Sequence, residues 1–175
     1  MSVPRDRYLE GATWEDWIER LGEEAWIWEE RFRQARLGRH RADFQEVPTP
    51  RYVLCLFDPE STEGYESVPL IAKACDQAGS AGGVELRLFP YEESQDIARQ
   101  YLTGERQALP LCVVFDDSWV QTGIFQPGPQ AESGKEWKDR VLEGLLSALR
   151  GQSVSPWLAG RNLSARRWRQ AERGG

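Results

Sequence analysis

Histidine, cysteine and lysine are scarce in this chain of 175 residues. His40 is the only histidine, and the three cysteines, Cys55, Cys75 and Cys112, are far apart in the sequence. Three widely spaced cysteines match neither a disulfide framework nor the ligand spacing of a zinc site. We therefore expect reduced thiols, with no metal and no other cofactor.

Long apolar runs are also missing. No window approaches the ~18–20 apolar residues that a membrane-spanning helix needs, and the mean hydropathy is -0.61. The first residues, MSVPRDRYLEGATWEDW, lack the apolar centre of a secretory signal. The composition therefore predicts a cytoplasmic protein that does not bind membranes, with 40% apolar residues available to form a core.

Negative charge dominates but is unevenly distributed. The net charge is -6, whereas residues 151–175 contain five arginines against one glutamate, which leaves -10 on the first 150 residues. An acidic body is a poor general binder of nucleic acid. The basic tail includes Arg166, Arg167, Trp168 and Arg169, which are candidates for contact with a partner. A nucleic-acid-associated protein that binds through this tail is a less favoured alternative.

The N-terminal part of the chain reads as a helical extension over residues 1–44. Apolar side chains recur at helical spacing over 13–37, beginning with a capping-box pattern at Thr13, and Gly22 is the position where this helix weakens or breaks. Tryptophan is frequent here, and we expect most of these rings to pack on the rest of the protein. Trp26 lies off the apolar stripe and is the candidate for an exposed partner surface.

Strand and helix patterns alternate over residues 45–150, between the extension and the tail of 151–175. After a polar connector (38–50), we expect strands over 51–57, 84–89, 111–116 and 119–125, and helices over 62–78, 94–102 and 135–150. A kink is expected at Pro69. The order β-α-β-α-β-β-α predicts an α/β fold, with a mixed sheet of about four strands flanked by helices.

This order resembles the thioredoxin fold, and two segments strengthen the resemblance. Leu109-Pro110 opens the third strand, where thioredoxin-like proteins have a cis-proline beside the active site. The stretch LFDPESTEGYESVPLIAKACDQAG (56–79) is similar to a bacterial branch of the thioredoxin family, whose active-site box reads roughly W-C-G-D. Glu60-Ser61-Thr62-Glu63 stands in place of that box, and Val68-Pro69 in place of the V-P that follows it.

The departure from this box determines the activity that we predict. Ser61 has the position of the nucleophilic cysteine and Gly64 that of the second cysteine. Disulfide exchange needs a thiolate at the helix N-terminus and a second thiol that resolves the mixed disulfide. A serine nucleophile would instead need a positioned base, and nothing in the sequence places His40 near Ser61. We therefore expect Asp58, Ser61 or Thr62 to cap the helix.

The sequence thus predicts a redox-inactive thioredoxin-like protein that binds a protein partner or acts as a subunit of an assembly. The resemblance implies an apolar groove beside the proline, where proteins of this fold bind extended peptides. Its expected residues are Ser61, Thr62, Leu109 and Pro110.

The cysteines carry the alternative function, that of a thiol-disulfide oxidoreductase or thiol-dependent reductase. In a thioredoxin-like fold the strands of Cys55 and Cys112 are antiparallel neighbours, so the resemblance implies that the two thiols lie close together. The favoured interpretation is that both, like Cys75, are small buried groups, since free cysteine is among the most buried residue types.

Overall fold

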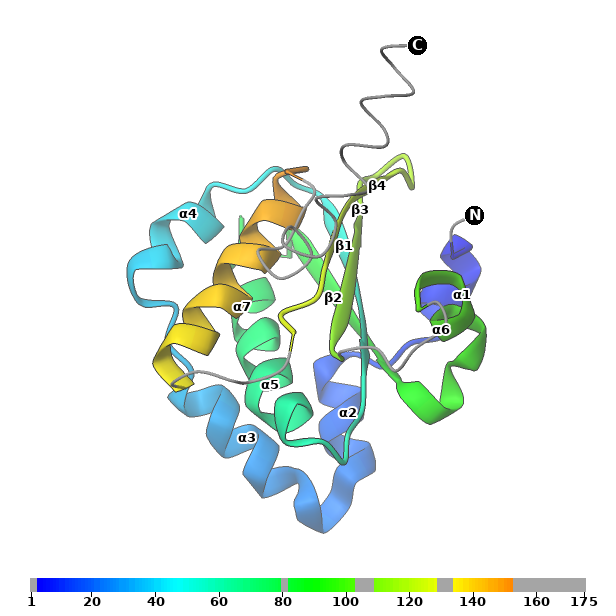
Figure 1. The fold of residues 1–175 in the computed structure, drawn as a ribbon, viewed down its shortest axis with the longest axis vertical. Helices are drawn as coiled ribbons and strands as arrows, with labels where there is room; N and C mark the ends of the chain where they lie inside the picture. The colour runs from blue at the N-terminus through cyan, green and yellow to red at the C-terminus, as the bar shows by residue number, and fades with distance from the viewer. Residues whose placement is uncertain (1–2, 80–81, 103–108, 129–133, 153–175) are drawn as a thin grey trace.

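The computed structural model describes residues 3–79, 82–102, 109–128 and 134–152 (Figure 1). The helices are α1 (Arg5–Leu9), α2 (Trp14–Leu21), α3 (Ala25–Gln34), α4 (Arg41–Gln45), α5 (Thr62–Gln77), α6 (Gln95–Tyr101) and α7 (Gly134–Leu149). The strands are β1 (Arg51–Phe57), β2 (Val84–Pro90), β3 (Leu111–Phe115) and β4 (Gln121–Phe125). From β1 to α7 the order is the predicted β-α-β-α-β-β-α.

The four strands form one mixed sheet in the order β2-β1-β3-β4. Strand β1 is parallel to β2 and antiparallel to β3, and β3 is antiparallel to β4. Asp116 stabilises the turn between β3 and β4, because its Oδ1 accepts hydrogen bonds from the N–H groups of Ser118 (2.9 Å) and Val120 (3.0 Å). The predicted fold class is confirmed.

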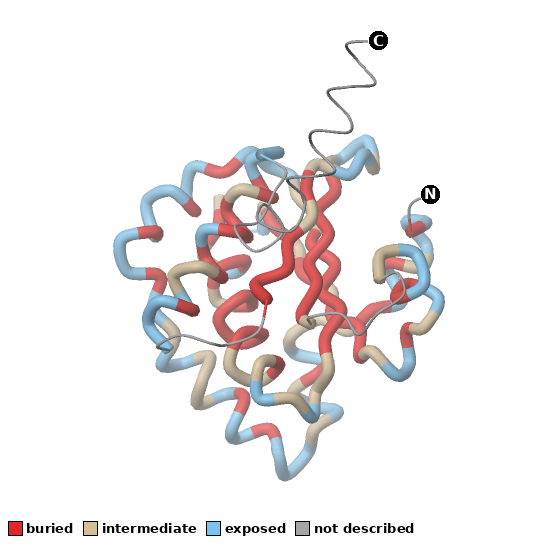
Figure 2. Tube along the Cα trace, viewed as in Figure 1, coloured by how far each residue is buried: buried red, intermediate tan, exposed pale blue. Residues whose placement is uncertain are grey.

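Helices cover both faces of the sheet, and the central strands are buried along most of their length (Figures 1 and 2). Because side chains alternate along a strand, Val53, Cys55 and Phe57 of β1 enter the core beneath α5 and α7. Leu54 and Leu56 enter the opposite core, which α1 and α6 cover. Burial on both faces explains why β1 reads as a continuous apolar run.

The predicted helix over 13–37 is two helices, because it breaks at Gly22. Its start is as predicted: Oγ1 of Thr13 accepts a hydrogen bond from the N–H of Asp16 (3.1 Å), and Asp16 accepts one from the N–H of Thr13 (3.2 Å). Gly22 has a φ of 61°, a left-handed conformation that glycine adopts without a steric penalty. Helices α2 and α3 therefore meet in a V at the foot of the view (Figure 1).

One other segment differs from the sequence-based expectation. The expected connector contains α4, whose Phe44 is fully buried and whose carbonyl oxygen accepts a hydrogen bond from Gly79 (2.9 Å). Helix α5 is present as predicted and runs from Thr62 to Gln77 with Pro69 inside it. Both helices thus pack into the core on the same face of the sheet.

Candidate functional site

The turn between β1 and α5 is built around Ser61, the N-cap of α5. Its Oγ accepts a hydrogen bond from the N–H of Gly64 (3.0 Å) and donates one to the carbonyl oxygen of Asp58 (2.9 Å). Oδ1 of Asp58 in turn accepts a hydrogen bond from the N–H of Glu60 (2.9 Å). The predicted cap is therefore Ser61, with its hydroxyl proton directed at a backbone oxygen.

The backbone at Gly64, the residue that the resemblance aligns with the second cysteine of a dithiol box, leaves no room for a side chain. A Cβ on Gly64 would lie 2.3 Å from the carbonyl oxygen of Asp58 and 3.1 Å from Oγ of Ser61. The first distance is far below van der Waals contact. The carbonyl oxygen of Asp58, which accepts the hydrogen bond from Ser61, therefore occupies the space that a side chain at position 64 would need. A cysteine at position 64 would require the turn to change its conformation.

The segment Leu109-Pro110 lies at the same end of the sheet as this turn. Leu56 is paired with Leu111 in the antiparallel register of β1 and β3, so Pro110 stands across from Phe57, directly before the turn. The Leu109–Pro110 peptide bond is cis. Pro110 is buried and Leu109 is half-buried.

At the start of α5, Thr62 is exposed and Ser61 is half-buried. The structure therefore brings the four residues of the predicted groove to one end of the sheet, with two of them after β1 and two before β3. Three of the four retain exposed surface.

Helices α2 and α3 pack beside this end of the sheet. Their packing on the sheet was predicted, but the end that they cover was not. Phe57 of β1 makes edge contacts with Trp17 (ring centroids 5.1 Å apart) and Trp28 (5.9 Å). Arg31 of α3 lies over the ring of Tyr65 at 4.9 Å and forms an ion pair with Glu66 at 2.7 Å. The spacing of the tryptophans predicts which face of the helices points inward, but not that this face covers Phe57 of β1.

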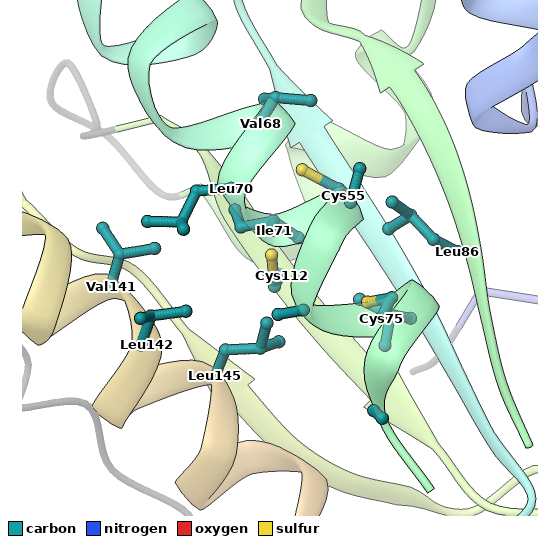
Figure 3. Close-up of a cluster of buried hydrophobic side chains, with 14 of the residues drawn as sticks. Cys55, Val68, Leu70, Ile71, Cys75, Leu86, Cys112, Val141, Leu142 and Leu145 are labelled. Carbon is teal, nitrogen blue, oxygen red and sulfur yellow. The ribbon is translucent and has the colours of Figure 1, made fainter. Parts of the chain in front are cut away.

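The three cysteines share the core beneath α5 (Figure 3). Cys55 and Cys112 are directly opposed in the register of β1 and β3, and neither has exposed surface. A hydrogen bond with the Cys55 side chain, together with burial, raises the pKa of Cys112 well above its usual value. Burial likewise raises the pKa of Cys75. A raised pKa disfavours the thiolate, the reactive form of cysteine.

Within the described ranges, the hydrogen bonds of the Ser61 hydroxyl join it to backbone groups and to no side chain that could act as a general base. His40, the only histidine, has its Nε2 3.1 Å from Oδ1 of Asp139 on α7. Among the described residues, no group of three or more His, Cys, Asp or Glu side chains could hold a metal ion. Of the other sites predicted from the sequence, Trp26 is 68% exposed, and the basic segment 166–169 lies outside the described residues.

No helix in the described part of the chain is long and apolar enough to cross a membrane.

Known proteins are similar to this chain mainly in fold. A family model described as thioredoxin matches residues 61–138. The crystal structure of a protein of unknown function from Pseudomonas aeruginosa is 16% identical, with a TM-score of 0.69 over 87% of this chain and 99% of that one. That of an HIV epitope scaffold is also 16% identical, with a TM-score of 0.61 over 86% and 94%. No curated protein gives a significant match.

Proposed function

We propose that this chain, whose fold resembles thioredoxin, is a binding protein that does not catalyse dithiol exchange. The observation that carries the proposal is the closed turn at Ser61. Its hydroxyl bridges the Asp58 carbonyl and the Gly64 N–H, and Gly64 has no space for a Cβ. A turn that caps a helix in this way has no nucleophile and no resolving group.

The binding surface that we propose is the groove of Ser61, Thr62, Leu109 and Pro110. Two features support it: these residues lie at one end of the sheet, and Thr62 and Leu109 retain exposed surface. An extended segment of a partner protein could add main-chain hydrogen bonds there and place apolar side chains against Leu109. The partner would be retained without any covalent bond.

Affinity capture with blocked variants tests this proposal. Wild-type protein and the Thr62→Arg/Leu109→Arg variant would each be used to capture proteins from a lysate of the source organism, with the bound proteins identified by mass spectrometry. We expect wild type to retain a defined partner under reducing conditions, and the double variant to lose it, because two arginines would fill the groove.

The control is Ser118→Arg/Val120→Arg, which adds the same charge to an exposed turn. This variant should retain the partner. A partner lost only when a thiol-blocking reagent is added, and insensitive to Thr62→Arg/Leu109→Arg, would contradict the proposal.

A thiol-based activity is the second candidate, because Cys55 and Cys112 oppose each other across neighbouring strands. Such an activity would need the core to open, since both side chains are fully buried. It predicts that Cys55→Ser abolishes turnover, whereas the binding proposal predicts that there is no turnover to abolish.

A further inference from the structure

A groove of about 680 Å³ lies along α2 and α3, apart from the Ser61 turn. Its apolar side chains are Trp14, Ile18, Trp26 and Phe32. Trp14 and Phe32 stack with ring centroids 5.1 Å apart and an angle of 25° between the planes. Trp26 is 68% exposed. A tryptophan that a bound partner buries contributes strongly to binding. The groove therefore offers a preformed aromatic surface with unused contact area.

Apart from Arg33, the rest of the groove is acidic. Glu15, Glu19 and Glu29 line it, and all three are exposed. Within the described ranges none of them forms an ion pair, whereas the fourth acid, Glu30, is paired with Arg33. Three unpaired carboxylates around aromatic rings favour a basic ligand that also carries an aromatic or apolar side chain.

We propose that the C-terminal segment of the same chain binds in this groove. Arg166, Arg167 and Arg169 would face the three glutamates, and Trp168 would pack on the aromatic side chains. The charge of the segment complements that of the groove, since residues 151–175 carry five arginines on an otherwise acidic chain. Because the segment is covalently connected to the groove, its effective concentration there is on the order of millimolar, as for a short flexible linker.

The length of the chain allows this contact. The segment starts after α7, and Lys138 in the second turn of α7 lines a pocket with Gln34 and Ala35 at the end of α3. A path back along the 16 residues of α7 and the 10 of α3 is roughly 40 Å at 1.5 Å per residue. An extended chain covers this distance in about 12–13 residues. Counted from Gln152, the first residues that reach the groove are those around 165, next to Arg166.

Disulfide trapping in the full-length chain tests the proposal. Glu19→Cys combined with Arg169→Cys places one new thiol in the groove and one on the segment, whereas the native cysteines are buried. The matched control combines Asp117→Cys with Arg169→Cys, since Asp117 is exposed on the β3–β4 turn. Under oxidised glutathione, we expect the intramolecular disulfide of the groove pair to form at least ~10-fold faster than that of the control.

Charge neutralisation provides the second arm. Glu15→Gln/Glu29→Gln in the groove pair should slow trapping several-fold, whereas Glu46→Gln/Glu92→Gln, which removes two exposed carboxylates elsewhere, should leave it unchanged. Equal trapping rates for the groove and control pairs would overturn the proposal. Disulfide-linked dimers in place of the intramolecular product would overturn it as well, because the occupant would then be the segment of another copy. Neither result depends on what binds near Ser61.

Discussion

The Ser61 turn and the Cys55–Cys112 pair each have half of what a dithiol oxidoreductase needs. The turn lies at a helix N-terminus with partly exposed side chains, but it holds a hydroxyl and a glycine. The pair has two opposed thiols, but they are fully buried and the pKa of Cys112 is raised. Thiolate chemistry requires access and a low pKa at the same sulfur. Neither place combines them.

Both places also contribute to the stability of the fold. The hydrogen bonds of Ser61 stabilise the first turn of α5 without any need for a thiol. The cysteines fill space between β1, β3 and α5 as other small apolar residues would. Thiols can be added to the Ser61 turn, and the groups that stabilise the turn and the core can be removed. The expected effects are given from the largest to the smallest.

Moving a thiol to the turn should have the largest effect. In Ser61→Cys we expect labelling by a thiol reagent at neutral pH to be at least ~100-fold faster than for any native cysteine, because the new thiol is partly exposed and lies at a helix N-terminus. The rates can be followed by absorbance and assigned by mass spectrometry. Wild type serves as the control, and rapid labelling of Cys55 or Cys112 in the native protein would contradict the account.

Adding the second thiol should damage the turn. In Gly64→Cys the new Cβ would collide with the Asp58 carbonyl, and we expect a loss of about 1–3 kcal/mol in the free energy of unfolding. Urea unfolding followed by circular dichroism measures this. Thr62→Cys, two residues earlier and exposed, should change stability by less than ~0.5 kcal/mol. A Gly64→Cys protein as stable as wild type would show that the turn has room for a dithiol box.

A polar substitution in the Cys55–Cys112 pair should destabilise the protein by as much as Gly64→Cys or by less. Cys112→Ser places a hydroxyl among apolar side chains, and we expect a cost of about 1–3 kcal/mol. Cys112→Val keeps the site apolar at similar volume and should cost less than ~1.5 kcal/mol. The reverse ranking in urea unfolding would indicate that Cys112 occupies a polar environment.

Removing the cap should have the smallest effect. Ser61→Ala loses the hydrogen bond to the Gly64 N–H, and we expect a cost of about 1 kcal/mol. Ser61→Asp retains an acceptor at the helix N-terminus, and its free energy of unfolding should be within ~0.3 kcal/mol of that of wild type. Thermal unfolding compares the two. If alanine and aspartate were equally neutral, the cap would contribute little to stability.

Local patterns predicted much of the fold because they depend on nearby residues. The apolar run 51–57 predicted β1 to the residue, and the capping box at Thr13 appears as expected. The sequence predicts Asp58, Ser61 or Thr62 as the cap of α5, and the geometry of the turn decides for Ser61.

Features that depend on distant residues were missed. Contact of Trp17 and Trp28 with Phe57 joins segments about 30–40 residues apart, and periodicity identifies the inward face of a helix but not its partner. The close approach of Gly64 to Asp58 arises from the conformation of the whole turn, so the glycine alone did not reveal it. The sequence of α4 predicts a connector because it is short and polar, with Phe44 as its buried residue.

The insulin-reduction assay tests the central claim most directly. Purified wild-type protein would be incubated with insulin and dithiothreitol, and precipitation of the reduced insulin chain followed by turbidity, with Cys55→Ser in parallel. The account predicts that wild type and Cys55→Ser both give the rate of dithiothreitol alone. Robust turnover by wild type that Cys55→Ser abolishes would contradict it, and would make this chain a thiol oxidoreductase that acts through its core cysteines.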